Sequence, residues 1–206
     1  PMVPRLHIVT NDEVLQQHDF TAQAVDLLLN LQRNIALHIR GRAQTGAQTF
    51  SIVQTLLEKA EFVGTLLVVN DRVDVALTAG ARGVQLGIRS LPVGTVRAMA
   101  GPRLAIGYSA HSPEEAAEAE RAGADFIFAG SIFRTTSHPE ITPAGLGGLA
   151  NCVDACSKPV FAIGGVNAKR VSEVLSTGAY GIAVIDAVWQ APDPVHAAQE
   201  LVRLLS

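Results

Sequence analysis

One loop of the sequence gathers side chains that bind anions and transfer protons. The segment GSIFRTTSHPE, from Gly130 to Glu140, follows the apolar run FIFA and contains several hydroxyl side chains, an arginine and a histidine. Hydroxyl and guanidinium groups donate hydrogen bonds to phosphate oxygens, and histidine exchanges protons near neutral pH. The segment therefore predicts a substrate loop for an anionic ligand, and a polar loop without a ligand is the alternative. The candidate residues are Ser131, Thr135, Ser137 and His138.

Further polar residues stand where other apolar runs end. In chain order they are His38, Arg40, Arg42, Asn70, Asp71, Ser109, His111 and Asp186. Alternation along an extended run places His38 and Arg40 on one face. A guanidinium at the end of a buried run needs an anion or solvent, because an unpaired buried charge is costly. The convergence of these side chains favours one ligand site.

Each of these residues also has a purely structural interpretation. Taken alone, His38 is more often a hydrogen-bonded core histidine than a catalyst. The pair Asn70–Asp71 can cap the helix that follows it. Ser109 and His111 can be turn residues before the next helix begins. These alternatives stay open at the level of sequence.

A glycine pair ends the seventh apolar run, AIGG. Glycines allow backbone N–H groups to approach phosphate oxygens closely, and many barrels bind phosphate at this place. We therefore expect phosphate binding by Gly164 and Gly165, together with Ile185 and Asp186 in the turn after the next run. A tight turn without a ligand is the alternative.

The elements that must position these residues alternate along the chain. Most of the apolar runs are apolar on both faces, as in parallel strands covered by helices. A helical pattern follows each of the runs at 6–10, 35–40, 65–70, 83–87, 104–110, 126–130, 160–165 and 181–189. The alternation predicts an α/β fold, a (β/α)8 TIM barrel forming a single domain over residues 1–206. A doubly wound open sheet is the alternative.

Helix boundaries are also visible. Residues 46–61 carry apolar side chains at helical spacing. Ser112 and Glu115 form the pattern of a capping box at the start of another helix. Gly123 fits the end of the same helix.

Composition excludes several classes of partner. The chain has 206 residues, of which 48% are hydrophobic, and its formal net charge is −3. This charge, with no basic patch, predicts no nucleic-acid partner. Cys152 and Cys156 lack a second pair of ligands nearby, so no metal site is expected from them. No apolar run has membrane-spanning length and no leader is evident, so we expect no membrane partner and a cytoplasmic location.

Five blocks are spread over nearly the whole chain: HIRGR, VVNDRVDVALTAGARGVQLG, IGYSAHSPEEAAEAERAGADFIFAGSIFRT, PVFAIGGVN and GIAVIDAV. In their order and spacing these blocks resemble the thiamin phosphate synthase/TenI superfamily. The resemblance implies a role in thiamin biosynthesis and a homodimer. Synthases of this superfamily join a pyrimidine diphosphate to a thiazole phosphate and use Mg²⁺. TenI-type proteins are thiazole tautomerases that act on a carboxythiazole phosphate.

Departures from the synthase pattern favour the TenI-type branch. Ser90, in GIRSLP, stands where the synthase motif G-x-x-D-L-P has an acidic residue, and His138 and Arg42 stand where lysines are expected. A site with one carboxylate fewer binds Mg²⁺ less well. The block HIRGR also resembles the TenI-type pattern. Residues that still match the synthase pattern are Arg40, Asn70, Asp71, Thr135 and Ser137.

The resemblance therefore implies a thiazole tautomerase that needs no cofactor and binds a thiazole phosphate. Ser131 replaces the histidine that TenI-type tautomerases use, and a serine is a poor general base, so His138 becomes the expected proton shuttle. His38 and His111 are the alternatives. Arg40 would pair with the substrate carboxylate. Two other functions stay open: a diverged synthase, for which Mg²⁺ is required, and a non-catalytic regulatory protein that binds thiazole phosphate.

Overall fold

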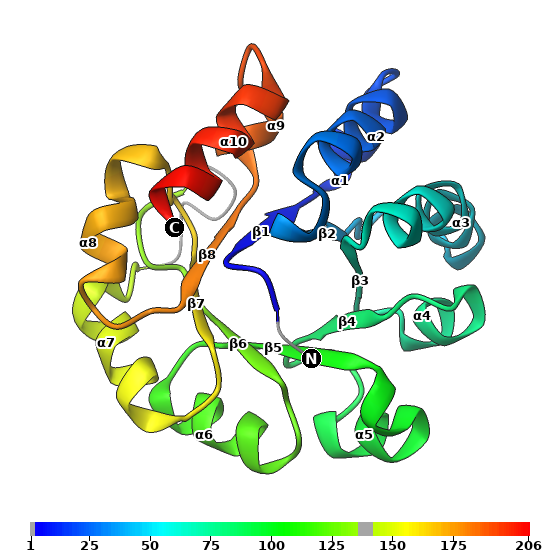
Figure 1. Cartoon of the computed structure of the whole chain (residues 1–206). Helices are drawn as coiled ribbons and strands as arrows, with labels where there is room; N and C mark the ends of the chain where they lie inside the picture. The colour runs from blue at the N-terminus through cyan, green and yellow to red at the C-terminus, as the bar shows by residue number, and fades with distance from the viewer. Residues whose placement is uncertain (1–2, 136–141) are drawn as a thin grey trace.

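The computed structural model describes residues 3–135 and 142–206, and its strands form a closed barrel (Figure 1). Neighbouring strands are parallel and follow the order of the sequence, and β8 pairs with β1 to close the ring. The strands are β1 (Leu6–Val9), β2 (Ile35–Ile39), β3 (Leu66–Asn70), β4 (Gly83–Leu86), β5 (Ala105–Ala110), β6 (Phe126–Ala129), β7 (Val160–Ile163) and β8 (Gly181–Val184). The predicted (β/α)8 barrel is confirmed, and the open-sheet alternative is wrong.

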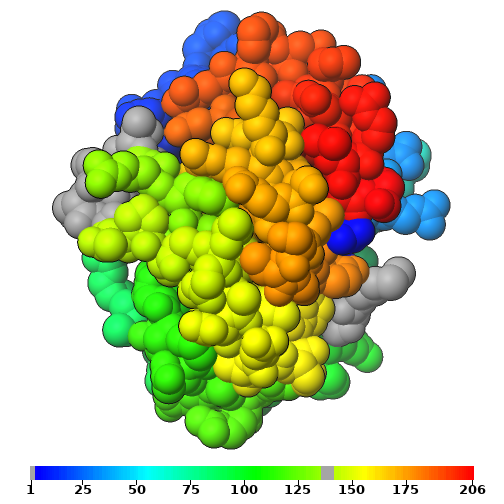
Figure 2. All heavy atoms as spheres, turned by 90° about the vertical axis from the view of Figure 1, so that its left-hand side faces the viewer, coloured from blue at the N-terminus to red at the C-terminus, as the bar shows by residue number. Residues whose placement is uncertain are grey.

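Helices surround the strands and bury their outward-facing side chains. The α-helices are α1 (Asp12–Leu15), α2 (Phe20–Leu31), α3 (Gly46–Val63), α4 (Val73–Ala79), α5 (Val93–Ala100), α6 (Pro113–Arg121), α7 (Gly145–Ala155), α8 (Val171–Leu175), α9 (Asp186–Trp189) and α10 (Pro194–Leu204). Short 3-10 turns are η1 (Gln32–Asn34), η2 (Gly101–Arg103) and η3 (Ala168–Arg170). Figure 2 shows α6, α7, α8 and α10, coloured from green to red, covering one side of the barrel. Among the described residues, none of the helices combines the length and apolar character needed to span a bilayer.

The helix signals are mostly confirmed. Ser112 Oγ accepts a hydrogen bond from the backbone N–H of Glu115 at 3.2 Å, as an N-cap should. The second half of the capping box differs, because Glu115 Oε2 accepts from the N–H of His111, at 2.8 Å, instead of from the cap residue. Gly123 follows the end of α6 with a φ of 104°, which a residue with a side chain adopts only with strain.

The sequence predicts one continuous strand for the apolar run at 181–189, but the structure divides this run between a strand and a helix. Strand β8 ends at Val184, and Asp186–Trp189 form the short helix α9. The indole N–H of Trp189 donates to the carbonyl oxygen of Val9 at 3.0 Å, and its ring packs against Phe20. The Trp189 side chain is therefore buried because helix α9 packs beside β1. Apolar composition alone does not distinguish such a helix from a strand.

Side chains fill the interior of the barrel, so no pore runs through it. The ring of His7 packs against those of Phe126, Phe128 and Phe161, with centroid separations of 5.1, 5.2 and 4.3 Å. These side chains and that of His38 are buried. A ligand at the C-terminal ends of the strands therefore cannot pass through the barrel.

Candidate active site

A cavity of about 870 Å³ opens at the C-terminal ends of the strands. Residues at or just beyond the end of each strand line it. The residues that sequence analysis selected and that lie on its wall are Arg40, Arg42, Asn70, Asp71, Ser109, His111, Ser131, Thr135, Gly164, Gly165, Ile185 and Asp186. The structure thus brings together most of the candidate side chains. Ser137 and His138 lie outside the described residues.

His38 does not line the cavity. It is buried in the barrel interior, where its Nε2 lies 2.7 Å from His7 Nδ1 and its Nδ1 lies 3.2 Å from Asn70 Oδ1. Burial lowers the pKa of His38 to about 3, so its ring is neutral at physiological pH. Of these three residues only Asn70 lines the cavity, and its hydrogen bond with the buried His38 holds its side chain in place.

Arginine side chains concentrate positive charge on one part of the wall. The backbone of Arg40 is fixed by Thr10, whose hydroxyl donates to the Arg40 carbonyl at 3.0 Å and accepts from its N–H at 2.8 Å. Burial lowers the pKa of Arg40, with Arg42 acting in the same direction and Asp71 opposing them. A guanidinium stays charged through such a shift. Arg42 and Arg89 line the same cavity together with the acidic Asp12, Glu13 and Asp71, so the arginines offer an anion cationic partners within a wall of mixed charge.

Asp71 lies among these cations and is held by the β4–α5 loop. Ser90 Oγ donates to Asp71 Oδ1 at 2.6 Å and accepts from the N–H of Gly87 at 2.9 Å. Asp71 does not cap the following helix, because the N-cap position of α4 is Arg72 and no side chain there makes a capping bond. The helix-cap alternative for Asn70–Asp71 is therefore wrong, and Asp71 directs its carboxylate toward the loop and the cavity.

The possible metal ligands near Asp71 suit a Mg²⁺ ion whose remaining ligands are phosphate oxygens of the substrate. Mg²⁺ is commonly held by one or two carboxylates together with phosphate oxygens, and a serine hydroxyl serves as a ligand in many nucleotide-binding proteins. Asp71 and Ser90 supply one carboxylate and one hydroxyl. Within residues 3–135 and 142–206, no group of three or more His, Cys, Asp or Glu side chains forms a metal cage. The residues fit the ion only in the presence of a phosphorylated ligand.

The turn after β7 requires its two glycines. Gly164 and Gly165 have φ values of 98° and 65°. A Cβ atom on Gly164 would lie 2.7 Å from Ser131 Cβ, and one on Gly165 would lie 2.5 Å from the Arg134 carbonyl oxygen. Both positive φ and close approach therefore exclude side chains. The turn lies on the same wall as Ile185 and Asp186, where the sequence predicts phosphate binding.

His111 is the histidine whose place on the cavity wall the structure describes. Its Nδ1 lies 2.9 Å from the carbonyl oxygen of Gly130. A carbonyl oxygen only accepts, so Nδ1 carries the proton and Nε2 is the basic nitrogen of the neutral ring. His111 therefore has the tautomer of a potential proton acceptor beside the β6 loop.

Sequence analysis missed several polar residues on the wall, among them Gln85, Arg89 and Arg170. Gln85 donates to Ser109 Oγ at 3.0 Å and so orients that hydroxyl. Gln85 and Arg89 stand in or just after the fourth run, so the strand-end rule that selected the other residues would have found them. Arg170 lies five positions beyond Gly165, in a segment with a helical pattern, and no sequence signal identifies it.

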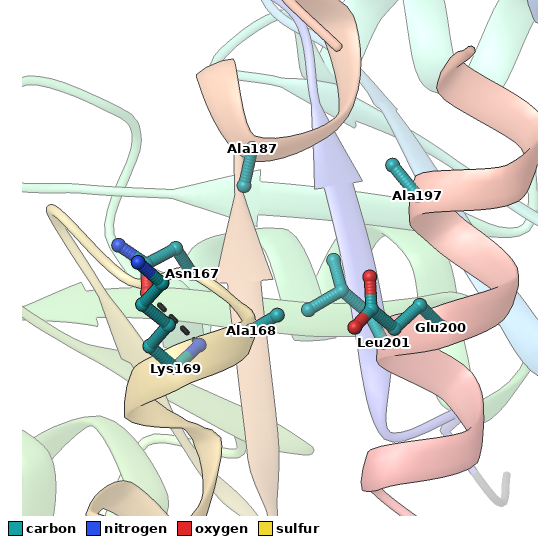
Figure 3. A pocket seen from close by; sticks show the side chains of 7 residues that line it. All are labelled: Asn167, Ala168, Lys169, Ala187, Ala197, Glu200 and Leu201. Atoms are coloured by element: carbon teal, nitrogen blue, oxygen red, sulfur yellow. Dashed lines mark hydrogen bonds between the residues drawn. The ribbon is translucent and has the colours of Figure 1, made fainter.

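A second hollow of about 280 Å³ lies between η3, α9 and α10, outside the barrel mouth (Figure 3). It has a mainly small and apolar lining with Lys169 and Glu200 on opposite sides. Asn167 and Ala187 line both this hollow and the larger cavity. None of the selected residues that the structure describes lies in it.

Fold and cavity together define a TIM-barrel protein with a polar site, containing arginines and carboxylates, at the C-terminal ends of its strands. Comparison with known proteins then gives the family. The model of the family described as thiamine monophosphate synthase, TMP-TENI, matches residues 6–188. The chain therefore belongs to this family.

Individual relatives support the same assignment. A thiamine-phosphate synthase of Pyrococcus furiosus is 42% identical over 170 residues, which is 82% of each chain. One from Chlorobium phaeovibrioides is 38% identical over 204 residues, covering 98% of this chain and 95% of the relative. The solved structure of a thiamine phosphate pyrophosphorylase from Pyrococcus furiosus matches with a TM-score of 0.84 and 38% identity, over 98% of this chain and 95% of the other.

These findings confirm the superfamily that the sequence resembles and support a role in thiamin biosynthesis. They do not single out the TenI-type branch. The relatives carry the name of the synthase, so the findings favour the synthase alternative over the tautomerase that the motif departures indicated.

Proposed function

We propose that this chain is a thiamin phosphate synthase, a transferase that joins a pyrimidine diphosphate to a thiazole phosphate. The observation that carries the proposal is the single cavity wall that contains both a cluster of arginines around Asp71 and the Gly164–Gly165 turn. Two phosphorylated substrates require two anion-binding regions within reach of each other. The names of relatives with 38% to 42% identity support the same reaction.

In this proposal the diphosphate lies against Arg40, Arg42 and Arg89. The bond from the pyrimidine methylene carbon to the diphosphate oxygen breaks, and the ring nitrogen of the thiazole forms a new bond to the same carbon. The guanidinium groups stabilise the negative charge that develops on the leaving diphosphate. Mg²⁺, when bound, would add positive charge at the same oxygens, held by Asp71 and Ser90.

The other substrate binds by its phosphate at the glycine turn. The backbone of Gly164 and Gly165, with that of Ile185, lines this part of the cavity. Asn70, supported by His38, and Ser109, oriented by Gln85, lie on the wall between the strand ends and supply neutral hydrogen-bonding groups. These groups orient the substrates without adding charge where the new bond forms.

The test is formation of thiamin phosphate from the two substrates in the presence of Mg²⁺. Asp71→Asn should lower kcat by about 100-fold, because Asp71 would hold the Mg²⁺ that stabilises the charge of the leaving diphosphate, and loss of one such stabilising interaction typically costs this much. Asp74→Asn is the matched control, since Asp74 lies three positions away, pairs with Arg72 and has 63% of its side chain exposed. No product from the wild-type protein at saturating Mg²⁺ would refute the proposal.

One observation favours a second candidate, a thiazole tautomerase. The partner of Asp71 is the neutral hydroxyl of Ser90, which holds Mg²⁺ less firmly than a second carboxylate would. For this reaction His111 would move the proton through Nε2, unless His138 does so. Turnover of carboxythiazole phosphate that is lost in His111→Gln or His138→Ala, but kept in the exposed variant His18→Gln, would establish this function. Saturable binding of thiazole phosphate without either turnover would leave a non-catalytic binding protein. The homodimer and the cytoplasmic location stay predictions.

A further inference from the structure

Asp186 introduces a negative charge at the place where a phosphate is expected. It is the first residue of α9 and lies on the cavity wall near the Gly164–Gly165 turn. A carboxylate repels a phosphate unless a cation offsets it. In the part of the chain that the structure describes, Asp186 forms no ion pair. A cation that offsets its charge would therefore have to act from elsewhere on the same cavity wall.

Arg170 is held beside this turn by two contacts. Its Nη1 donates to the carbonyl oxygen of Gly165 at 2.5 Å. Its guanidinium carbon lies 4.2 Å from the centroid of the Phe133 ring, in cation–π geometry. A guanidinium fixed on two sides loses little further freedom when it binds a ligand.

The glycine turn itself permits this position of Arg170. A Cβ atom on Gly165 would lie 3.3 Å from Arg170 Nη1, a distance at which one of the two groups must shift. Arg170 is half-buried and lines the main cavity. A guanidinium has five N–H donors, and the contact with Gly165 uses one of them. The remaining donors are available to an anion on the cavity side.

We infer that Arg170 binds the phosphate group of the ligand at the Gly164–Gly165 turn and offsets the charge of Asp186. The inference rests on the proposed binding of a thiazole phosphate in this cavity, and it adds a residue that determines specificity for the phosphorylated ligand. With Arg134 on the same wall, two positive charges face one carboxylate, which leaves this end of the site electropositive. Arg170 thereby permits an acidic residue at a phosphate site.

The test is calorimetric binding of thiazole phosphate and of the dephosphorylated thiazole alcohol. Arg170→Met should weaken binding of the phosphate by about 10- to 100-fold, as expected for loss of a hydrogen bond to a charged group, and leave the alcohol unchanged. Asp186→Asn should tighten binding of the phosphate. Lys169→Met is the matched control, because Lys169 is the adjacent cation, is exposed and lines the smaller hollow (Figure 3).

A second variant separates charge from structure. Arg170→Gln keeps an N–H donor for the Gly165 carbonyl and removes the positive charge. If Arg170 only holds the turn, Arg170→Gln binds the phosphate as the wild type does, and the inference is overturned. If Arg170 binds the ligand, Arg170→Gln loses affinity for the phosphate at an unchanged melting temperature, and Arg170→Lys regains part of it.

The outcome is separable from that of the proposed function. A wild-type protein that makes no thiamin phosphate but whose phosphate binding depends on Arg170 overturns the reaction and supports the inference. Thiamin phosphate formation with equal phosphate binding by wild type and Arg170→Gln supports the reaction and overturns the inference. Absence of thiazole phosphate binding in the wild type overturns both.

Discussion

The buried pair His7–His38 should make this protein sensitive to mild acid. Both rings are fully buried, and the Nδ1 of His7 lies 2.7 Å from the Nε2 of His38. Burial lowers the pKa of His38 to about 3 and, together with the neighbouring His38, lowers that of His7 well below its usual value. The surrounding rings of Phe126, Phe128 and Phe161 provide no charge that would stabilise an imidazolium.

The sign and size of the effect follow from proton binding. In the unfolded chain both histidines take up protons below about pH 6.5, whereas the folded protein excludes them until the pH approaches about 3 for His38. Their contribution to stability is therefore complete above about pH 6.5 and is lost as the pH falls. Between about pH 7 and pH 5.5, each histidine should remove roughly 1 kcal/mol from the free energy of unfolding, or about 2 kcal/mol together.

Urea unfolding followed by circular dichroism at several pH values measures this loss. His7→Phe places an apolar ring among aromatic side chains and should reduce the pH slope by about half, whatever its effect on stability at neutral pH. His196→Gln, at an exposed position of α10, is the control and should leave the slope unchanged. The reasoning is wrong if NMR shows either buried ring titrating near pH 6.5 in the folded protein, or if His7→Phe keeps the full slope.

Three further substitutions test structural contacts by urea unfolding. Arg97→Met should destabilise by about 3 kcal/mol, because Arg97 donates to three backbone carbonyls and, at 2.6 Å, to Asp125, which would keep the hydrogen bond from the N–H of Ile106 but lose its cation. A decrease of less than about 1 kcal/mol in the free energy of unfolding would mean that Arg97 and Asp125 contribute no more than an exposed ion pair does. Ser112→Ala should cost about 1 kcal/mol through loss of the N-cap of α6, and no change would mean that the cap bond is replaced. Gly107→Ala should cost about 2 kcal/mol or more, because its Cβ would contact Gln85 and Phe126 inside the filled barrel, and a neutral effect would show that the interior relaxes.

The sequence was sufficient to predict the barrel and much of the cavity for one physical reason. Parallel strands covered by helices must be apolar on both faces, so polar residues become visible where each strand ends, as with Arg40 and Ser109. The same rule misjudged α9, because Trp189 is buried by helix packing and its apolar neighbours look like a strand. Asp186 therefore begins a helix and does not end a strand.

Other features depend on contacts that no local pattern contains. Arg170 reaches the cavity through its hydrogen bond to Gly165 and its packing on Phe133, which comes from a distant part of the chain. His38 lies in the interior because His7, 31 positions earlier, offers a partner there. The choice between synthase and tautomerase depends on how Ser90 and Asp71 hold a metal and a ligand, and spacing in the sequence does not encode that affinity.

Closure of the barrel has a consequence for synthesis of the chain. Strand β1 lies between β2 and β8, and the N–H of Ile182 donates to the carbonyl oxygen of Arg5 at 2.9 Å. Arg5 also donates to the carbonyl oxygens of Tyr180 and Leu205, so the first and last parts of the barrel are joined directly. During synthesis, one edge of β1 has no neighbouring strand to pair with until β8 has emerged from the ribosome. Exposed strand edges pair with other chains, so aggregation threatens the nascent chain until the ring closes, and protection by chaperones is needed most during this interval.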